Sequence, residues 1–246
     1  MSGTVDYEVR GNIAVITLRN PGKLNVLSPE MITGLEVAWH RLEHADEQAA
    51  VLTAEGDRAF CAGIDLDAVS LDMWRCVPGL NVEVQKPVVA AVAGHCIGAG
   101  WVLVQYCDLI VATDDARFSY PEGKVGAFGG LASGIVTRVP HKIAAEFLML
   151  GNPIAAARAH DVGMINAVVG TGEHIALAEE WAKKLADSAP LVVRAAKDLI
   201  DEHVGQGRVE QHVRTGRALG RISSSSDMQE GIAAFREKRP PVFRGR

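Results

Sequence analysis

Two glycine-containing segments, about thirty residues apart, carry the residue types best suited to chemistry in this chain. They are Cys61-Ala62-Gly63-Ile64-Asp65 and Gly94-His95-Cys96-Ile97-Gly98-Ala99-Gly100. Each joins an apolar, strand-like run (49–54 and 88–93) to a predicted helix start, where glycine lets the backbone bend and the first N–H groups lack helical acceptors. Two such turns facing one another would direct two N–H donors at one oxygen. This arrangement is typical of an oxyanion hole, which stabilises an enolate or a tetrahedral anion.

Length and composition restrict the class of protein. A chain of 246 residues with 48% hydrophobic and 22% charged residues predicts a globular protein with one core plus a small appendage. No apolar run reaches the roughly 18 residues of a membrane span, and the first ten residues show no signal-peptide pattern. We therefore expect a cytoplasmic location and no membrane partner. The net charge of -5, with dispersed Lys and Arg, argues against nucleic acid as a partner.

The cysteines and histidines do not form a metal-binding or nucleophilic motif. The four cysteines include no C-x-x-C pair and lack a histidine at zinc-finger spacing, so we expect reduced thiols and no bound metal. His40 and His44 are four residues apart, but Arg41 replaces the glutamate of a zinc hydrolase motif. Cys61 and Cys96 border the two glycine turns without evident His and Asp partners, which disfavours a thiol nucleophile.

The elements that must position these turns are predicted from periodicity and turn residues. Residues 7–9 and 13–18 flank Gly11-Asn12 and predict a β-hairpin. Ser28-Pro29 predicts the start of a helix with an apolar face at helical spacing. Strand and helix patterns alternate over residues 49–112, and helical patterns dominate from residue 131, with a short strand at 165–169 and a last helix extending to residue 235. The predicted fold class is α/β.

Six segments occur in an order that resembles the enoyl-CoA hydratase/isomerase (crotonase) family over nearly the whole chain. They are residues 20–28, 51–53 with 60–66, 86–100, 107–109, 118–122, and 230–231 with 235–240. The resemblance implies a spiral of repeated ββα units in a core domain of residues 1–190. It also implies a helical C-terminal oligomerisation region at 191–246, and a homotrimer or a dimer of trimers.

The resemblance further implies an acyl-CoA thioester as substrate, with no other cofactor because coenzyme A is part of that substrate. The thioester oxygen would lie between the backbone N–H groups of Ile64 and Ala99. The turn residues Ala62, Gly63, Asp65 and Gly98 would border the thioester. Lys23 and Leu24 match the loop that binds the adenine and phosphates, and Lys238 matches a lysine that reaches toward a neighbouring subunit's ligand. Asp67 stands where the family commonly has a basic residue.

Carboxylates should decide which reaction follows. Hydratases of this family use two glutamates to orient and activate water, and one of the two corresponding positions holds Val102 here. The other holds Glu122, in Pro121-Glu122. One base can move a proton between two carbons of an enoyl thioester, whereas losing an acid-base group usually costs about 10²- to 10⁴-fold in rate. The sequence thus favours enoyl-CoA isomerisation with Glu122 as the catalytic base.

Two alternatives remain open. One is an enoyl-CoA hydratase (a lyase) in which another residue, such as His95, replaces the missing glutamate, although we expect His95 to pack rather than react. The other is a non-catalytic acyl-CoA-binding protein. For Asp65 the sequence favours a helix cap over a catalytic role. Burial against Trp101 or Phe128 would raise the pKa of Glu122.

Overall fold

The chain begins with the predicted β-hairpin. A computed structural model describes residues 3–65, 71–126, 130–203 and 226–242. Strands β1 (Thr4–Arg10) and β2 (Ile13–Arg19) pair antiparallel, with Arg10 opposite Ile13. Gly11 has a φ of 67°, a left-handed conformation that glycine adopts with little strain. The turn therefore sets the register that the sequence indicates.

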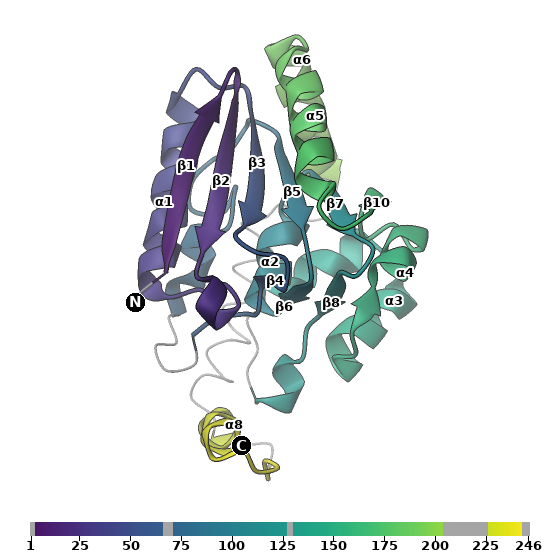
Figure 1. Ribbon diagram of the computed structural model, residues 1–246. Coiled ribbons are helices and arrows are strands. Elements are labelled where there is room, and N and C mark those ends of the chain that lie inside the picture. Colours follow the sequence, from purple (N-terminus) through teal and green to yellow (C-terminus); the bar gives the residue numbers. More distant parts are fainter. Residues whose placement is uncertain (1–2, 66–70, 127–129, 204–225, 243–246) are drawn as a thin grey trace.

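A six-stranded sheet continues from this hairpin and forms the centre of the molecule (Figure 1). Its order is β1-β2-β3-β5-β7-β10, where the remaining strands are β3 (Ala49–Ala54), β5 (Val88–Val92), β7 (Leu109–Thr113) and β10 (Ala167–Val169). From β2 onward every pair is parallel. Strands β3 and β5 are buried at every position, which explains their uninterrupted apolar sequences.

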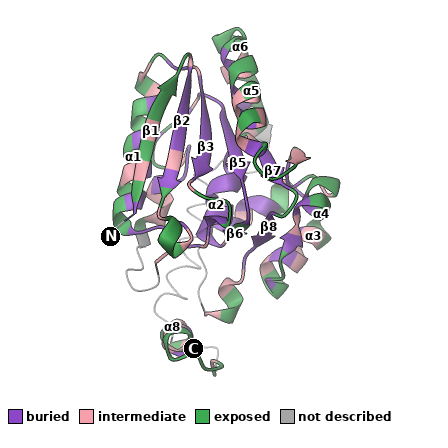
Figure 2. Cartoon of the chain, in the orientation of Figure 1, coloured by how far each residue is buried: buried purple, intermediate pink, exposed green. Residues whose placement is uncertain are grey.

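Helices cover both faces of the large sheet (Figure 2). On one face lies α1 (Pro29–His44), which begins as predicted because Ser28 Oγ accepts a hydrogen bond from Met31 N at 3.3 Å. On the other face lies α5 (His174–Ala186), which packs against β3, β5 and β7 through three alanines. They are Ala178, Ala182 and Ala186, spaced at one turn, and their small side chains let the helix lie close to the strands.

A second, smaller sheet has four strands in the order β4-β6-β8-β9. Its strands are β4 (Ala59–Cys61), β6 (His95–Ile97), β8 (Arg117–Ser119) and β9 (Ile154–Ala155). The prediction that each glycine turn follows directly on a long apolar strand is wrong in this respect. The chain leaves β3 or β5, pairs briefly in the small sheet, and only then enters the turn. Strands of two or three residues are too short to produce a periodic sequence signal.

The other helices are shorter, apart from α6. They are α2 (Ala99–Gln105), α3 (His141–Ala145), α4 (Ala156–Asp161), α6 (Pro190–His203) and α8 (Ser226–Glu237). Single 3-10 turns lie at Pro21–Lys23 and Glu122–Lys124, longer 3-10 segments at Leu71–Cys76 (kinked at Asp72) and Leu131–Thr137, and a π-helical turn at Glu146–Leu150. Over the described ranges, no helix is both long and apolar enough to cross a membrane.

The predicted domain boundary near residue 190 stays a prediction; α6, which begins at Pro190, is tied to the core by a buried lysine. Lys197 Nζ donates to the backbone oxygen of Lys86 at 2.9 Å and forms an ion pair with Asp108 at 2.8 Å. Lys86 is itself buried, and its Nζ donates to two carbonyls at the end of α1. A role of residues 191–246 in oligomerisation stays a prediction.

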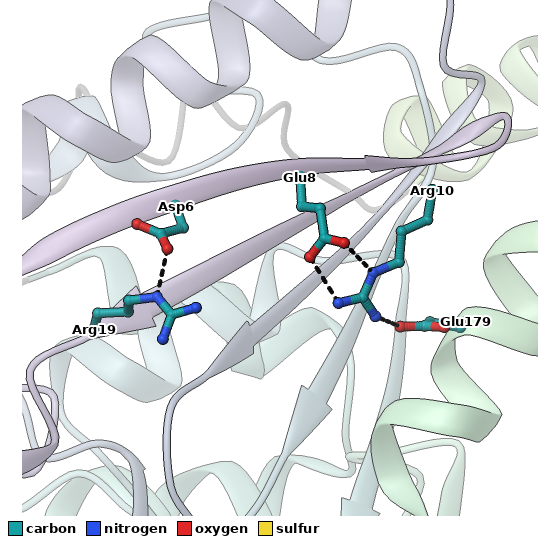
Figure 3. A network of polar contacts seen from close by, with 5 residues as sticks. All are labelled: Asp6, Glu8, Arg10, Arg19 and Glu179. Atoms are coloured by element: carbon teal, nitrogen blue, oxygen red, sulfur yellow. Dashed lines mark hydrogen bonds and ion pairs between the residues drawn. The ribbon is translucent and has the colours of Figure 1, made fainter.

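Exposed ion pairs lie on the hairpin of β1 and β2 (Figure 3). Arg10 contacts Glu8 at 2.7 Å and also pairs with Glu179 of α5, while Arg19 pairs with Asp6 across the two strands. Such pairs are screened by solvent and contribute little to stability. The contact between Arg10 and Glu179 joins β1 to α5.

Candidate active site

The predicted site residues come together because three neighbouring strands of the small sheet run parallel. Strand β6 pairs in parallel with β4 on one side and with β8 on the other. Parallel strands end at the same edge of a sheet, so the segments that follow them lie side by side. These segments contain Ile64 after β4, Ala99 after β6 and Glu122 after β8. The three predicted catalytic residues thus share one edge.

Pairing with the first loop orients the N–H group of Ile64. Leu27 N donates to Gly63 O and Asp65 N donates to Leu27 O, both at 2.9 Å, which makes a parallel bridge between Leu27 and Ile64. In such a bridge the polar groups of the middle residue, Ile64, point away from its partner. Within the described part of the chain, Ile64 N–H donates to no acceptor. It is therefore free to bind an oxygen.

The second N–H group belongs to the first residue of α2. Ala99 N lies in the first helical turn, where no intrahelical acceptor exists, and no other described residue accepts from it. Its φ is negative, so alanine fits where the family commonly has glycine. The preceding Gly98 has φ 56° and ψ -112°, a conformation that requires glycine.

Gly100 holds the two turns together. A Cβ atom at this position would lie 2.5 Å from the carbonyl oxygen of Cys61 and 2.9 Å from its Cβ, far inside van der Waals contact. The absence of a side chain lets α2 approach the end of β4. This close approach places both free N–H groups on neighbouring turns of the same edge.

Glu122 faces this pair of turns from the third strand. A Cβ atom on Gly98 would collide with Glu122 Oε1, so the carboxyl group lies directly against the second turn. Glu122 Oε2 is buried and has no hydrogen-bond partner among the described residues. Burial raises the pKa of Glu122 to about 8, partly offset by a backbone N–H that donates to the carboxylate. A carboxyl group with this pKa can both take and return a proton near neutral pH.

The position predicted to distinguish this chain from hydratases carries no acid-base group. Val102 lies on α2 three residues after Ala99, and it is 1% exposed within the core. Its neighbour Trp101 packs edge-to-face against Phe118 and Phe147, at centroid distances of 5.7 and 5.3 Å.

The expected rise in the pKa of Glu122 is confirmed. Phe128 and Asp67, which the sequence analysis also named, lie outside the described residues.

Two alternative reactive groups fit the geometry poorly. His95 is exposed, so the expectation that it packs is wrong: its side chain projects from the opposite face of β6 to that of the buried Cys96. Burial raises the pKa of the Cys61 thiol to about 12 and that of Cys96 well above its usual value. Both thiols are therefore protonated near neutral pH, which argues against a thiolate nucleophile.

The first loop lies next to the first turn. Ala62 N donates to Leu24 O at 3.0 Å, and Lys23 Nζ lies 3.8 Å from Asp65 Oδ2. Lys23 is exposed and is the counter-charge of Asp65. The buried Asn25 anchors the loop by donating to the carbonyls of Glu55 and Ala59, at 3.0 and 2.9 Å.

Helix α8 lies on the segment that follows Glu122. A Cβ atom at Gly231 would overlap the carbonyl oxygen of Val125, so the helix backbone touches this segment directly. Lys238 follows the helix, is exposed, and has a φ of 53°. The predicted contact of Lys238 with a neighbouring subunit's ligand stays a prediction.

Sequence reasoning missed two residues at the site. Leu27, in the first loop, orients the Ile64 N–H group. Gly151 packs against Pro121, the residue before Glu122. The Gly-Asn-Pro run at 151–153 signals a turn, but no sequence pattern indicates what a turn will contact.

Comparison with other proteins agrees with this geometry. The enoyl-CoA hydratase/isomerase family model matches residues 8–246. The chain is 31% identical to the (E)-benzylidenesuccinyl-CoA hydratase of Thauera aromatica, over 98% of this chain and 99% of that protein. It is also 31% identical to the enoyl-CoA hydratase EchA19 of Mycobacterium tuberculosis, over 97% and 96% of the two chains.

Solved structures show the same fold. The crystal structure of carnitinyl-CoA hydratase from Mycobacterium avium matches with a TM-score of 0.90 and 32% identity, over 99% of both chains. This chain thus combines an α/β fold with a free N–H group on each of two adjacent turns and a buried carboxyl group beside them. The chain belongs to the enoyl-CoA hydratase/isomerase family.

Proposed function

We propose that this protein is an enoyl-CoA isomerase that moves the double bond of an enoyl-CoA thioester through an enolate. The observation that carries the proposal is the buried Glu122 carboxyl group, which lies against the turn that holds the Ala99 N–H. The names of the relatives, all acyl-CoA enzymes, support the thioester as substrate class. The buried valine at position 102 favours a reaction that needs one acid-base group.

The proposed reaction has two proton transfers. The ionised Glu122 carboxylate removes a proton from the carbon α to the thioester carbonyl of a 3-enoyl-CoA, and the electron pair moves onto the carbonyl oxygen. The N–H groups of Ile64 and Ala99 donate to this oxygen and stabilise its charge, each by about 3 to 4 kcal/mol. Glu122, now protonated, returns the proton to the γ carbon, which gives the conjugated 2-enoyl-CoA.

Coenzyme A would bind along the first loop. We propose that the backbone of Lys23 and Leu24 borders the adenine, that the exposed Lys23 ammonium contacts a phosphate, and that Lys238 adds a second cation. The turn residues Ala62, Gly63, Asp65 and Gly98 would line the thioester. A homotrimer or a dimer of trimers in the cytoplasm completes the proposal.

Replacing the base tests this function. The variant Glu122→Gln should lower kcat for 3-enoyl-CoA isomerisation by about 10²- to 10⁴-fold while keeping acyl-CoA binding, because the amide cannot take the proton. Glu180→Gln, which changes an exposed glutamate of α5, is the matched control and should keep full activity. Glu122→Gln turnover within threefold of the wild type would exclude Glu122 as the base.

The raised pKa of Glu122 predicts a pH dependence. Only the carboxylate form accepts a proton, so kcat/KM should rise with pH and reach half its maximum at about pH 8. Folding should show the opposite trend, since a pKa raised from about 4.5 to about 8 stabilises the folded protein below pH 4.5 and loses that contribution as pH rises through 8. Urea unfolding at pH 5 and pH 9 would measure this, with Glu122→Gln lacking the decline.

Hydration is the second candidate, and the printed names of the relatives favour it. Incubation of a 2-enoyl-CoA in ¹⁸O-labelled water distinguishes the two reactions, because hydration places the label in a 3-hydroxyacyl product and isomerisation does not. Rapid labelling would replace the isomerase proposal by a hydratase with one carboxylate. Tight acyl-CoA binding without either reaction would instead indicate a non-catalytic binding protein.

A further inference from the structure

Gly151 makes a backbone-to-backbone contact directly behind Glu122. It ends the π-helical turn Glu146–Leu150 with φ 61° and ψ 25°. A Cβ atom built on it would lie 2.9 Å from Pro121 Cα and 3.1 Å from the carbonyl oxygen of Tyr120. Real Cβ atoms do not approach a backbone atom to 2.9 Å, so any side chain here must push the Tyr120–Pro121 peptide away. Glu122 directly follows Pro121 in the chain.

The same π-helical turn also contacts the element that carries the second N–H donor. Phe147 is fully buried and packs edge-to-face on Trp101 of α2, with ring centroids 5.3 Å apart. Ala99 begins that helix two residues earlier. One short segment therefore touches both α2, through Phe147, and the Glu122 segment, through Gly151.

Other contacts hold the Glu122 segment from different directions. Lys124 Nζ donates to Gly151 O at 3.5 Å, and the backbone of α8 at Gly231 rests on Val125. Gly98 lies against the carboxyl group itself. A displacement of Pro121 thus has little room to be absorbed, and it should be passed to the Glu122 side chain.

From these contacts we infer that Gly151 is a positioning residue for the acid-base group. By contacting Pro121 without a side chain, it lets Glu122 sit against Gly98 and beside the Ala99 N–H. The inference rests on the proposed role of Glu122. It assigns a function to the end of the π-helical turn, a segment that lies 29 residues after Glu122 in the chain.

Two substitutions separate contact from backbone strain. Gly151→Ala adds a Cβ atom and also places a non-glycine residue at φ 61°, whereas Gly151→Asn adds the same Cβ atom in a residue that tolerates this φ better. Gly163 provides the matched control, because its φ is 76° and nothing lies within 4 Å of its Cβ position. Gly163→Ala and Gly163→Asn therefore introduce the strain without the contact.

We expect both Gly151 variants to lower kcat for the 3-enoyl-CoA by about 10- to 10²-fold with KM changed less than threefold, since a shift of about 1 Å in a catalytic group has this effect. Both Gly163 variants should keep kcat within twofold. Full activity in Gly151→Asn, or an equal loss in the Gly163 variants, would overturn the inference.

The pH profile provides a readout that a purely structural role would not move. If Glu122 is displaced from its buried position, water reaches its carboxyl group and the midpoint of kcat/KM should fall below that of the wild type by about one pH unit or more. The charged groups on the surrounding elements include Lys124, the Glu146–Arg158 pair and the Glu230–Arg239 pair, together with Asp65 on the first turn and Asp227, Arg236 and Glu237 on α8, and α2 carries none. None of them is changed in these variants.

The outcomes also separate this inference from the proposed function. Loss of activity in Glu122→Gln together with an unchanged midpoint and kcat in both Gly151 variants would reject the positioning role alone. Full activity in Glu122→Gln would reject the proposed function. Thermal melting of each Gly151 variant beside its Gly163 counterpart identifies any loss that comes from unfolding.

Discussion

The two sheets differ in what they contribute. The large sheet has strands of up to seven residues, and its central strands β3 and β5 are buried at every position, with α5 packed against one face. The small sheet has strands of two or three residues, yet three of them lead directly into Ile64, Ala99 and Glu122. Side chains of the large sheet provide the buried area that stabilises the fold. The small sheet mainly directs backbone groups and one carboxyl group to a common edge.

Different sheets therefore stabilise the fold and position the site: the large sheet does the first and the small sheet the second. A sheet of such short strands would not be stable by itself. It is held by its continuity with the large sheet and by glycines that permit close contacts, with backbone at Gly100 and Gly151 and with the Glu122 carboxyl group at Gly98. A substitution in the large sheet should therefore affect unfolding, and one at the small sheet's edge should affect turnover.

The largest effect on stability is expected from Leu52→Ala in β3. Leu52 is fully buried, and its truncation should lower the free energy of unfolding by about 2 to 5 kcal/mol through lost burial and the cavity left behind. Urea unfolding measures this change. At temperatures where the variant is folded, kcat should stay within threefold of the wild type. A tenfold loss of kcat in fully folded Leu52→Ala would contradict the separation of the two sheets.

A smaller effect, and one on turnover rather than on unfolding, is expected from Gly98→Ala at the small sheet's edge. The new Cβ atom would occupy the place of Glu122 Oε1 and strain the turn that holds the Ala99 N–H. We expect kcat to fall by about 10²- to 10³-fold, similar to the loss of an oxyanion donor. Steady-state kinetics measures it.

Gly172→Ala is the control for that substitution. Its φ is 92°, and its Cβ position is open, so it introduces comparable strain far from the edge. Equal losses of kcat in the two variants would show that backbone strain alone, and not the contact with Glu122, explains the result.

The smallest effect is expected from Ser28→Ala, at the junction of the two regions. Ser28 caps α1 and follows Leu27, which pairs with Ile64. Loss of the cap should lower the free energy of unfolding by about 1 kcal/mol. Differential scanning calorimetry measures it, and the exposed Thr33→Ala on the same helix serves as control. A kcat loss above fivefold would mean that the start of α1 also positions the Ile64 donor.

Much of the large sheet could be predicted from the sequence, because its signals are local. The turn at Gly11, the cap at Ser28 and the apolar runs of β3 and β5 all appear where the pattern indicates. The motifs also indicated Ile64, Ala99 and Glu122 as the site, and the structure brings these three to one edge. Two of the three were expected to contribute backbone N–H groups, so their places in the motifs mattered more than their side chains.

Only the tertiary structure decided how these groups are directed. Ile64 N–H is free because Leu27, 37 residues earlier, uses the neighbouring polar groups. The pKa of Glu122 is raised because elements far apart in the chain exclude water from its carboxyl group. The exposure and hydrogen bonding of these groups depend on which segments meet in space, and a local sequence pattern does not indicate that. The sequence thus determined which groups are present, while packing between distant segments decided their direction, hydration and acidity.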